Sequence, residues 1–288
     1  MIISASRRTD IPAFYADWFF NRLREGTVYS RNPFNGKLLP PVSLRPSDVD
    51  CIVFWTKNPG PMINRLELLE PLPYYFQVTV NPYDAMIEKA FGGKDQILDA
   101  ITELSGMIGP DRVVWRYDPV FVNERYTPDF HIRAFADYAR RLERRVNRCI
   151  ISFVDEYRSI STRMAGFDIV PVSMEDILSF ARAFSGICRE SGMEIFSCAE
   201  PHDLAAEGVR PASCIDPVLI SKITGREMAF EKDRNQRKEC GCAKSVDIGA
   251  YDTCPGGCAY CYANRREASL ARNLRNYDPD SPVLCGNK

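Results

Sequence analysis

The chain has 288 residues and carries 37 lysines and arginines against 38 aspartates and glutamates, for a net charge of −1. This balance gives no overall positive field that would attract nucleic acid or an anionic membrane, so we expect neither as a partner. No apolar run is long enough to span a bilayer, and none at the start resembles a signal peptide, which predicts a cytoplasmic protein. With 45% hydrophobic residues, the chain can fill the core of one large domain or of two small ones.

Short β-rich runs recur along the chain, and most are continuous apolar or β-branched stretches of the kind that is buried on both faces of a parallel sheet. The predicted strands cover residues 2–7, 51–56, 75–80, 112–117, 148–154, 194–198 and 244–249. Apolar side chains recur at helical spacing between several of them, which predicts helices over residues 97–108, 132–142 and 177–188. Ser173 is the expected N-cap of the third helix.

Strands that alternate with helices build right-handed βαβ units. Six or seven such units predict an α/β fold with a partial or complete parallel (β/α) barrel, and a doubly wound open sheet is the alternative. We expect residues 1–225 to form the barrel body. Residues 226–288 are predicted to be a cysteine-rich segment packed on the same barrel.

A polar residue followed by proline ends four of the predicted strands. These polar residues are Asn58, Asn81, Asp118 and Glu200. Proline has no N–H group and cannot continue a strand ladder, so each pair leaves a polar side chain near the carboxyl end of its strand. That end of a parallel barrel is where active sites form, and the pattern therefore predicts a polar rim.

Three cysteines near the C-terminus, Cys254, Cys258 and Cys261, follow the spacing C-x3-C-x2-C. Three thiolates on a glycine-rich loop can hold three irons of a 4Fe–4S cluster and leave the fourth iron open to a small molecule. Structural zinc prefers four ligands, often arranged as C-x2-C pairs, and the triplet supplies one such pair. We favour the cluster over zinc and over reduced structural thiols.

Four further cysteines are spread over a longer stretch of the chain: Cys198, Cys214, Cys240 and Cys242. A barrel rim can gather them, and four thiolates would complete a second 4Fe–4S cluster without an open iron, or an all-cysteine zinc site. We favour a second metal centre over four ordinary thiols, and iron–sulfur over zinc at that centre. Cys51, Cys149 and Cys188 fit buried apolar positions instead.

The whole chain resembles an uncharacterised, radical-SAM-like family known by a domain-of-unknown-function label. The matching stretches are IISASRRTDIP at the start, FWTKNP, WRYDP, ISFVD, and NQRKECGC through YCYA at the end. The resemblance implies a radical S-adenosylmethionine (SAM) fold that is circularly permuted, so that the cluster loop lies at the C-terminus rather than near the N-terminus. It also implies a 4Fe–4S cluster and SAM as cofactors.

The resemblance further implies that the reduced cluster cleaves SAM and that the resulting 5′-deoxyadenosyl radical abstracts a hydrogen from a substrate. That substrate is an unknown small molecule or peptide, and the electron donor is a protein such as flavodoxin or ferredoxin. The superfamily's usual glycine-glycine-glutamate motif for the SAM amino group is not evident, so the contacts to SAM fall to rim residues. The cofactor supplies the chemistry, and the protein supplies position and electrostatics.

Cations near the rim are candidates for the SAM carboxylate, and we name Lys57 and Arg116. The amine and ribose need acceptors, for which the candidates are Asn58, Thr79, Asn81, Ser152 and Asp155. Tyr260, inside the cysteine motif, is expected to pack near the adenine. The candidates for substrate binding or proton transfer are Arg7, Arg8, Asp10, Asp118 and His202. For Arg7 and Arg8, grip on an anionic substrate group and an ion pair with Asp10 remain equal alternatives.

Two other functions stay open at this point. One is a non-catalytic iron–sulfur or zinc-binding module with a redox or structural role. The other is a radical SAM enzyme of nucleic-acid repair or modification, against which the neutral net charge and the lack of an aromatic–basic motif argue.

Overall fold

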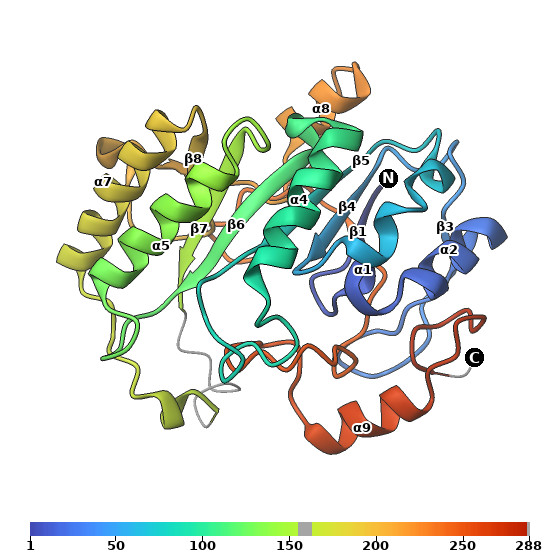
Figure 1. Ribbon diagram of the computed structural model, residues 1–288. Helices are drawn as coiled ribbons and strands as arrows, with labels where there is room; N and C mark the ends of the chain where they lie inside the picture. Colours follow the sequence, from blue (N-terminus) through green and yellow to red (C-terminus); the bar gives the residue numbers. More distant parts are fainter. Residues whose placement is uncertain (155–162, 287–288) are drawn as a thin grey trace.

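The computed structural model describes residues 1–154 and 163–286 and has an eight-stranded, all-parallel sheet at its centre (Figure 1). The strand order is β10-β1-β4-β5-β6-β7-β8-β9. The strands are β1 (Ile2–Ala5), β4 (Cys51–Thr56), β5 (Tyr74–Thr79), β6 (Val113–Val120), β7 (Arg148–Phe153), β8 (Glu194–Ser197), β9 (Arg210–Pro211) and β10 (Val246–Asp247). Within the described residues the sheet is open, because no ladder joins β9 to β10. The fold is therefore α/β with a large parallel sheet, as expected, and the complete barrel is not formed here.

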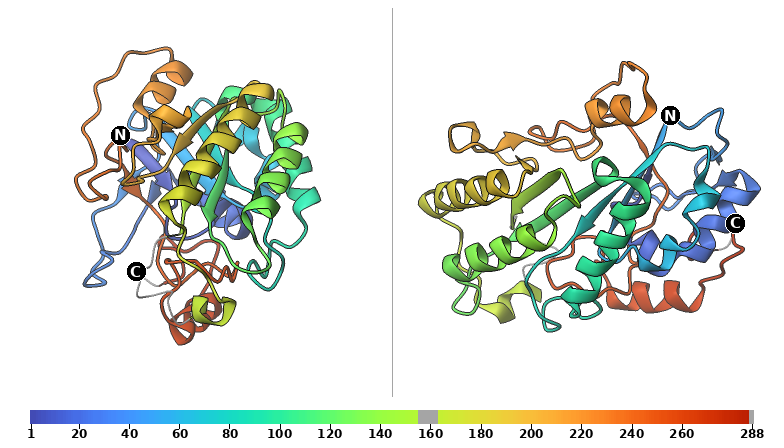
Figure 2. Two further views of the ribbon diagram at one scale, coloured as in Figure 1. Left: turned by 90° about the vertical axis from the view of Figure 1, so that its left-hand side faces the viewer. Right: turned by 45° about the horizontal axis from the view of Figure 1, so that its top comes forward.

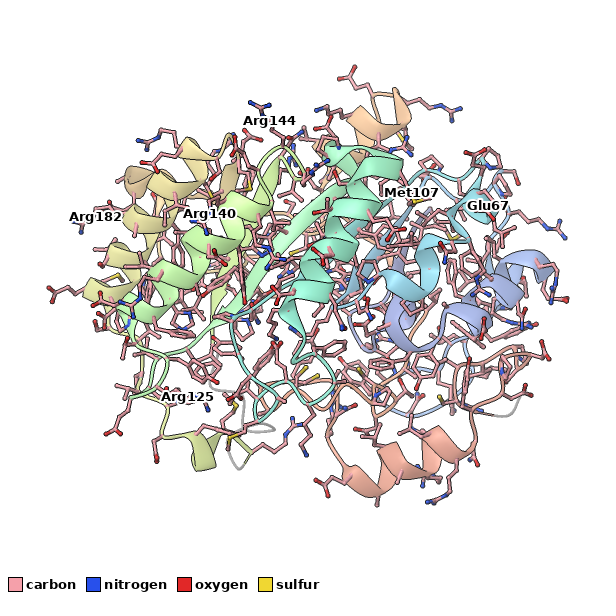
Figure 3. All side chains as sticks on the ribbon, in the orientation of Figure 1. Glu67, Met107, Arg125, Arg140, Arg144 and Arg182 are labelled. Carbon is pink, nitrogen blue, oxygen red and sulfur yellow. The ribbon has the colours of Figure 1, made fainter. Side chains whose placement is uncertain are left out.

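The long helices confirm the apolar periodicities of the sequence. They are α4 (Lys94–Ile108), α5 (Pro128–Arg141) and α7 (Met174–Glu190). The Ser173 side chain accepts a hydrogen bond from the Asp176 N–H and so caps α7, as predicted. The three helices cover one face of the sheet, and Figure 3 shows charged side chains such as Arg140 and Arg182 on their outer side.

Shorter helices connect or flank the strands. They are α1 (Ile11–Phe14), α2 (Ala16–Glu25), α3 (Gly60–Ile63), α8 (Pro217–Thr224) and α9 (Glu267–Arg275), with short 3-10 turns η1 (Leu66–Leu69), η2 (Pro110–Arg112), η3 (Ala165–Phe167) and η4 (Ala205–Glu207). A small antiparallel pair, β2 (Thr27–Val28) with β3 (Val42–Ser43), was not expected from the sequence. None of the described helices is both long and apolar enough to cross a membrane.

Apolar side chains pack against both faces of the sheet. On the face covered by α5 and α7, the Phe135 ring stacks on Trp115 and on Phe184, with centroid distances of 4.7 and 4.0 Å. Such aromatic pairs add about 0.5–1.5 kcal/mol each beyond the burial of their area. On the other face, strand residues such as Tyr75 and Val114 pack against the chain around Cys214 and α8. Burial on both faces explains why the strands read as continuous apolar runs.

The C-terminal segment joins the sheet through its first residues. Strand β10 pairs with β1 in parallel, with Ile3 opposite Val246 and Ser4 opposite Asp247. The chain that follows β10 therefore leaves the sheet at the same edge as the chain that follows β1. The division into a body of residues 1–225 and a segment of residues 226–288 stays a prediction, although this segment contributes a strand to the common sheet. Figure 2 shows the segment, in orange to red, running from one end of the sheet to the other.

Candidate functional site

The cysteine loop lies at the carboxyl ends of the central strands. Cys258 forms an antiparallel bridge with Glu88, which belongs to the connection after β5. The Ala259 N–H donates to the Ile87 carbonyl at 2.8 Å, and the Ala90 N–H donates to the Gly256 carbonyl at 3.2 Å. In Figure 1 this orange-red segment runs below the sheet. The loop thus meets the polar rim that the sequence predicted for the same end.

Burial and hydrogen bonding set the protonation state of two thiols in the loop, Cys254 and Cys258. Burial and the nearby Asp10 raise the pKa of Cys254 to about 12, although backbone N–H groups of Gly256 and Asp10 donate to its sulfur. Burial also raises the pKa of Cys258 well above its usual value, against the opposing effect of Lys57. Cys254 and Cys258 are therefore protonated thiols in the free loop, and a metal would have to displace those two protons to bind them.

The backbone of the loop is shaped for a close approach. A Cβ atom on Gly256 would lie 2.7 Å from the Phe91 ring and 3.3 Å from the sulfur of Cys254. Gly257 has a φ of +66° and would meet Lys89 at 3.1 Å. Glycine alone accepts both the positive φ and the lack of space. A soft donor set of three thiols on a tightly turned loop fits a thiolate-bound iron centre.

The described residues contain no ready-made site for a single ion. In residues 1–154 and 163–286, no three or more His, Cys, Asp or Glu side chains are placed so that they could hold a metal ion. In a 4Fe–4S cluster each cysteine binds a different iron, so the sulfurs stand apart rather than around one point. The predicted cluster at Cys254, Cys258 and Cys261 therefore stays a prediction.

A buried ionic network lies directly beside the loop. The Lys57 Nζ atom is 2.8 Å from Glu88 Oε1, and Lys94 at the start of α4 pairs with the other oxygen of this carboxylate. The Tyr260 hydroxyl, from within the cysteine motif, also donates to Glu88, which is fully buried. Two lysines on one carboxylate leave one excess positive charge close to Cys258.

The pKa values in this network follow from its charges. Burial by itself would raise the pKa of Glu88, but Lys57 and Lys94 outweigh burial and hold this pKa below its usual value. For Lys57, burial lowers the pKa, yet Glu88 and nearby groups raise it above its usual value. For Lys94, burial outweighs the attraction of Glu88 and lowers the pKa below its usual value. The pairing therefore favours the charged forms of Glu88 and Lys57, while burial opposes the charge on Lys94.

Predicted rim residues on β5 and β6 form a second polar network that continues the first. The Asn81 amide donates to the Asp118 carbonyl at 2.8 Å and to the Tyr260 hydroxyl at 3.1 Å, and its oxygen accepts the Asp118 N–H at 2.8 Å. The Asp118 carboxylate pairs with Arg116 and accepts from the Ser152 hydroxyl. Burial would raise the pKa of Asp118, but Arg116 and these hydrogen bonds lower it. The structure thus brings Asn81, Asp118, Arg116, Ser152 and Tyr260 together.

Asp10 and Asn58 hold the backbone of the rim. The Asp10 carboxylate accepts the Ala13 N–H at 3.0 Å, which caps α1, and the Lys57 N–H at 2.8 Å. Burial raises the pKa of Asp10 to about 6, although these hydrogen bonds oppose the shift. The Asn58 side chain accepts the Gly60 N–H at 2.9 Å at the start of α3. Both side chains fix turns, in addition to any contact with a ligand.

The two arginines that follow β1 point to different places. The Arg7 guanidinium lies 3.6 Å from Asp233, and the Arg8 guanidinium lies 3.9 Å from Asp247 and 5.4 Å from the Tyr251 ring. They do not form a joint fork for one anion. Ion pairing is thus observed for both residues, but with later aspartates rather than with Asp10.

The remaining predicted residues are less closely grouped. Thr79, at the end of β5, lies opposite Arg116 in the sheet register. His202 is exposed in the connection after β8. Asp155 lies outside the described residues. Their predicted roles stay predictions.

The four further cysteines come together on the face of the sheet opposite α5 and α7. The sulfurs of Cys198 and Cys214 are 3.3 Å apart, and Cys242 interacts with Cys214 on one side and with Cys240 on the other. The Arg116 guanidinium lies 2.9 Å from the sulfur of Cys214. Among the described residues no three of these thiols are placed so that they could hold one metal ion, so the gathering is observed and the second metal centre stays a prediction. Cys51, Cys149 and Cys188 are buried, as expected.

Sequence reasoning missed Glu88 and Lys94. Glu88 lies in the connection after β5 and Lys94 is the first residue of α4, and solvent exposure is the usual outcome for a charged residue at such positions. Their role depends on contact with the cysteine loop, and Tyr260 in that loop lies 172 residues after Glu88 in the sequence. The only local signal is that Glu88 follows the apolar Ile87 close behind a predicted strand.

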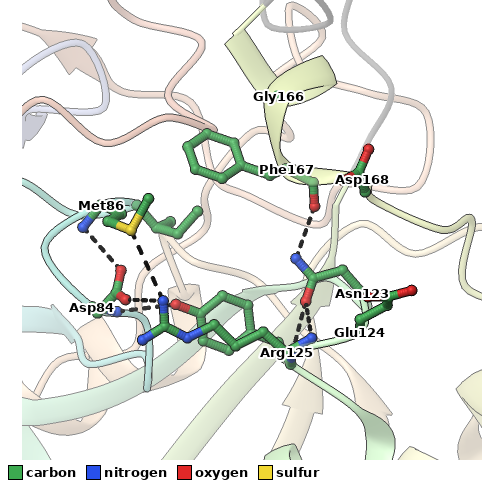
Figure 4. Close-up of a pocket in the computed structure, with 10 residues that line it drawn as sticks. Asp84, Met86, Asn123, Glu124, Arg125, Gly166, Phe167 and Asp168 are labelled. Atoms are coloured by element: carbon green, nitrogen blue, oxygen red, sulfur yellow. Dashed lines mark hydrogen bonds and ion pairs between the residues drawn. The ribbon is translucent and has the colours of Figure 1, made fainter.

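A cavity of about 240 Å³ opens beside the rim, next to the segment that pairs with the cysteine loop (Figure 4). It is lined by Asp84, Met86, Ile87, Asn123, Glu124, Arg125, Tyr126, Gly166, Phe167 and Asp168. Arg125 pairs with Asp84 at 2.5 Å, and the Asn123 amide donates to the Phe167 carbonyl at 2.8 Å. Arg125, Asp84 and Asn123 therefore already have ion-pair or hydrogen-bond partners within the cavity wall.

Comparisons with known proteins identify a family but no activity. No curated protein matches the chain. Among solved structures, a putative alpha-L-fucosidase from Bacteroides thetaiotaomicron VPI-5482 is similar at 10% identity, covering 75% of this chain and 82% of that chain, with a TM-score of 0.29, too low to support an argument about fold or function. The family described as "Domain of unknown function (DUF1848)" matches residues 2–263. The chain therefore belongs to the DUF1848 family.

Proposed function

We propose that this protein is a radical SAM enzyme that acts on a substrate still to be identified. The observation that carries the proposal is the position of the cysteine loop, which packs against the carboxyl ends of parallel strands beside an excess of buried positive charge. Active sites of parallel α/β folds form at that end of the sheet. The pairing of β10 with β1 supports a permuted arrangement, because the loop then stands beside the first strand although it comes last in the sequence.

Cys254, Cys258 and Cys261 would hold three irons of a 4Fe–4S cluster. Such a cluster, with SAM bound, supplies the electron for reductive cleavage of the sulfonium. The chain's own contribution starts with the N–H groups of Gly256 and Asp10, which donate to the Cys254 sulfur and stabilise it as a thiolate. The Phe91 ring packs against Gly256 and keeps water from that side of the loop.

The excess charge at Glu88 suits the carboxylate of SAM. Within residues 1–154 and 163–286, the carboxylate paired with Lys57 is that of Glu88, which Lys94 also contacts, so Lys57 retains attraction for a second anion. Arg116 is less suited, because its guanidinium already contacts Asp118, Gln77 and Cys214. We therefore assign the SAM carboxylate to Lys57. Asn81, which joins both networks, is the best placed of the predicted amine and ribose contacts.

The gathering of four cysteines on the face of the sheet opposite α5 and α7 supports the second metal centre as part of this proposal. Cys198, Cys214, Cys240 and Cys242 come from three separate stretches of chain and meet beside the Arg116 guanidinium, which would balance the negative charge of bound thiolates. The four cysteine side chains would have to rotate before their sulfurs could bind a common metal centre. Metal retained after removal of the three loop cysteines, and lost on Cys214→Ala, is the expected result.

The enzyme proposal is tested with anaerobically purified protein. Iron and sulfide are counted, the protein is reduced, SAM is added, and 5′-deoxyadenosine is measured. We expect the product from the wild type and from the control Cys188→Ala, which removes a buried thiol on α7 away from the loop. We expect none from Cys258→Ala. A wild type that holds iron but yields no 5′-deoxyadenosine would favour the non-catalytic module instead.

A further inference from the structure

Two of the four further cysteines stand almost within bonding distance of each other. The sulfurs of Cys198, which follows β8, and of Cys214, which follows β9, are 3.3 Å apart. A disulfide bond is about 2.0 Å long, so the sulfurs would have to approach each other by only about 1.3 Å. Strands β8 and β9 pair in parallel, and beside the two cysteines the Ala212 N–H donates to the Ser197 carbonyl at 2.7 Å. The sheet therefore holds the two thiols side by side.

Side chains on β5 and β6 fix Cys214 in this position. The Tyr75 hydroxyl donates to the Cys214 carbonyl at 2.6 Å, and the Gln77 amide donates to the same oxygen. The Arg116 guanidinium lies 2.9 Å from the Cys214 sulfur. Both the backbone and the thiol of Cys214 are thus already ordered, so a bond to Cys198 costs little further conformational entropy.

The two thiols differ in their access to solvent. Cys198 is partly exposed, whereas Cys214 is buried. A small oxidant can therefore reach Cys198 directly, and Cys214 is placed to attack the oxidised sulfur from within the protein. Contacts with Cys198 and Arg116 lower the pKa of Cys214, but contact with Cys242 and burial raise it more. Because the thiolate is the nucleophile, we expect the reaction to be slow and to need an excess of oxidant.

We propose that Cys198 and Cys214 form a reversible disulfide when the protein meets a peroxide. The Cys198 sulfur attacks hydrogen peroxide, the O–O bond breaks, and a sulfenic acid and one water form. The Cys214 sulfur then attacks the Cys198 sulfur, the S–O bond breaks, and the disulfide forms as a second water leaves. The two thiols together give two electrons to one peroxide, and both thiol protons end in the two waters.

The disulfide and the second metal centre of the proposed function use the same two sulfurs and exclude each other. Oxidation of the pair would therefore remove that centre, and a dithiol reductant would restore it. This consequence rests on the proposed function. The disulfide itself does not, because it needs only the two thiols and the peroxide. Reversible disulfides in a reducing compartment usually serve redox sensing or catalysis, and redox sensing is the role that fits here.

The test uses the full chain, stripped of metal with a chelator and reduced. The protein is treated with an excess of hydrogen peroxide, its remaining thiols are alkylated, and crosslinked peptides are identified by mass spectrometry. We expect a crosslink between Cys198 and Cys214 that dithiothreitol removes. The matched control is Cys149 with Cys188, whose thiols are also in contact but are both fully buried. We expect crosslinking of this pair to be at least about tenfold lower, because the oxidant does not reach it.

Thiol counting on two variants gives a second readout. Cys188→Ala should lose two thiols per chain to peroxide, as the wild type does. Cys198→Ser should lose none, because the thiol that the oxidant reaches first is gone. The crosslink map of the wild type needs no variant, so it decides the proposal even where a variant does not fold.

Several results would overturn the proposal. Cys198 and Cys214 could stay reduced, or be oxidised without a crosslink, or Cys214 could link to Cys242 instead. Equal crosslinking of Cys149 with Cys188 would indicate oxidation of unfolded chains, and loss of two thiols from Cys198→Ser would exclude entry of the oxidant at Cys198. Metal content is a separate measurement: reduced protein that holds no metal at these cysteines would refute the second metal centre and leave the disulfide standing.

Discussion

Glu88 is the most sensitive electrostatic position in the candidate site. Its carboxylate is fully buried and pairs with Lys57 and Lys94, while Tyr260 and Asn81 donate to it. The substitution Glu88→Gln keeps the shape of the side chain but removes its charge. Two buried ammonium groups then lose their counter-ion, and each must either stay charged in a poor solvent or release its proton.

The expected cost at neutral pH is about 3–5 kcal/mol of unfolding free energy, the usual effect of removing one partner from a buried ion pair. The cost should also depend on pH. Without Glu88, burial lowers the pKa values of the lysines in the folded state below those in the unfolded state. The unfolded chain then binds more protons, so the stability of the variant rises with pH relative to the wild type.

Urea unfolding of the wild type and of Glu88→Gln, at about pH 7 and about pH 9.5, checks both the size and the sign of the effect. The deficit should shrink at the higher pH. Glu67→Gln is the control, because Glu67 is exposed and its loss should change stability by no more than about 0.5 kcal/mol. A deficit below about 1 kcal/mol, or one that is the same at both pH values, would refute the reasoning.

Two further predictions concern other buried positions. Burial lowers the pKa of His131 from 6.5 to about 4, so the unfolded state binds more protons between these values and stability is lost as the pH falls through them. In urea unfolding, His131→Gln should remove about 3 kcal/mol of this change of stability with pH. An unchanged dependence of stability on pH in this variant would contradict the prediction, and so would an equal change in the exposed control His202→Gln. Gly256→Ala places a Cβ atom 2.7 Å from the Phe91 ring, so we expect the iron bound per chain to fall by more than about half. Gly106→Ala, which meets open space on α4, should leave iron content unchanged, and normal loading of the Gly256 variant would count against the close fit of the loop.

Local patterns in the sequence were enough to predict most of the sheet and its long helices. Strands β1, β4, β5, β6, β7 and β8 lie within three residues of the predicted ranges, because buried parallel strands need continuous apolar runs. Helices α4, α5 and α7 follow from apolar residues at helical spacing. The polar residues before proline predicted the rim at Asn58 and Asn81, which follow the ends of β4 and β5. The prediction that Asp118-Pro119 ends its strand was wrong, because β6 continues to Val120, with a register shift against β7 between Tyr117 and Val120.

Short or irregular elements depended on contacts that local patterns do not carry. Strand β9 has two residues and was missed, and β10 has two residues within a predicted run of six. Strands this short exist only because a neighbour supplies hydrogen-bond partners. Long-range packing also leaves the sheet open. The chain between β9 and β10 packs against the face of the sheet opposite α5 and α7, and within the described residues no ladder joins β9 to β10.

In the candidate site, the sequence by itself determined which side chains are available, and the tertiary structure decided which of them meet. The spacing of Cys254, Cys258 and Cys261 fixes a compact loop because all three thiols lie on one short stretch of backbone. The burial of Glu88 between two lysines and the separation of Arg7 from Arg8 have no local cause. Charged side chains reach water by default, and only contacts with chain segments far away in the sequence take them out of it.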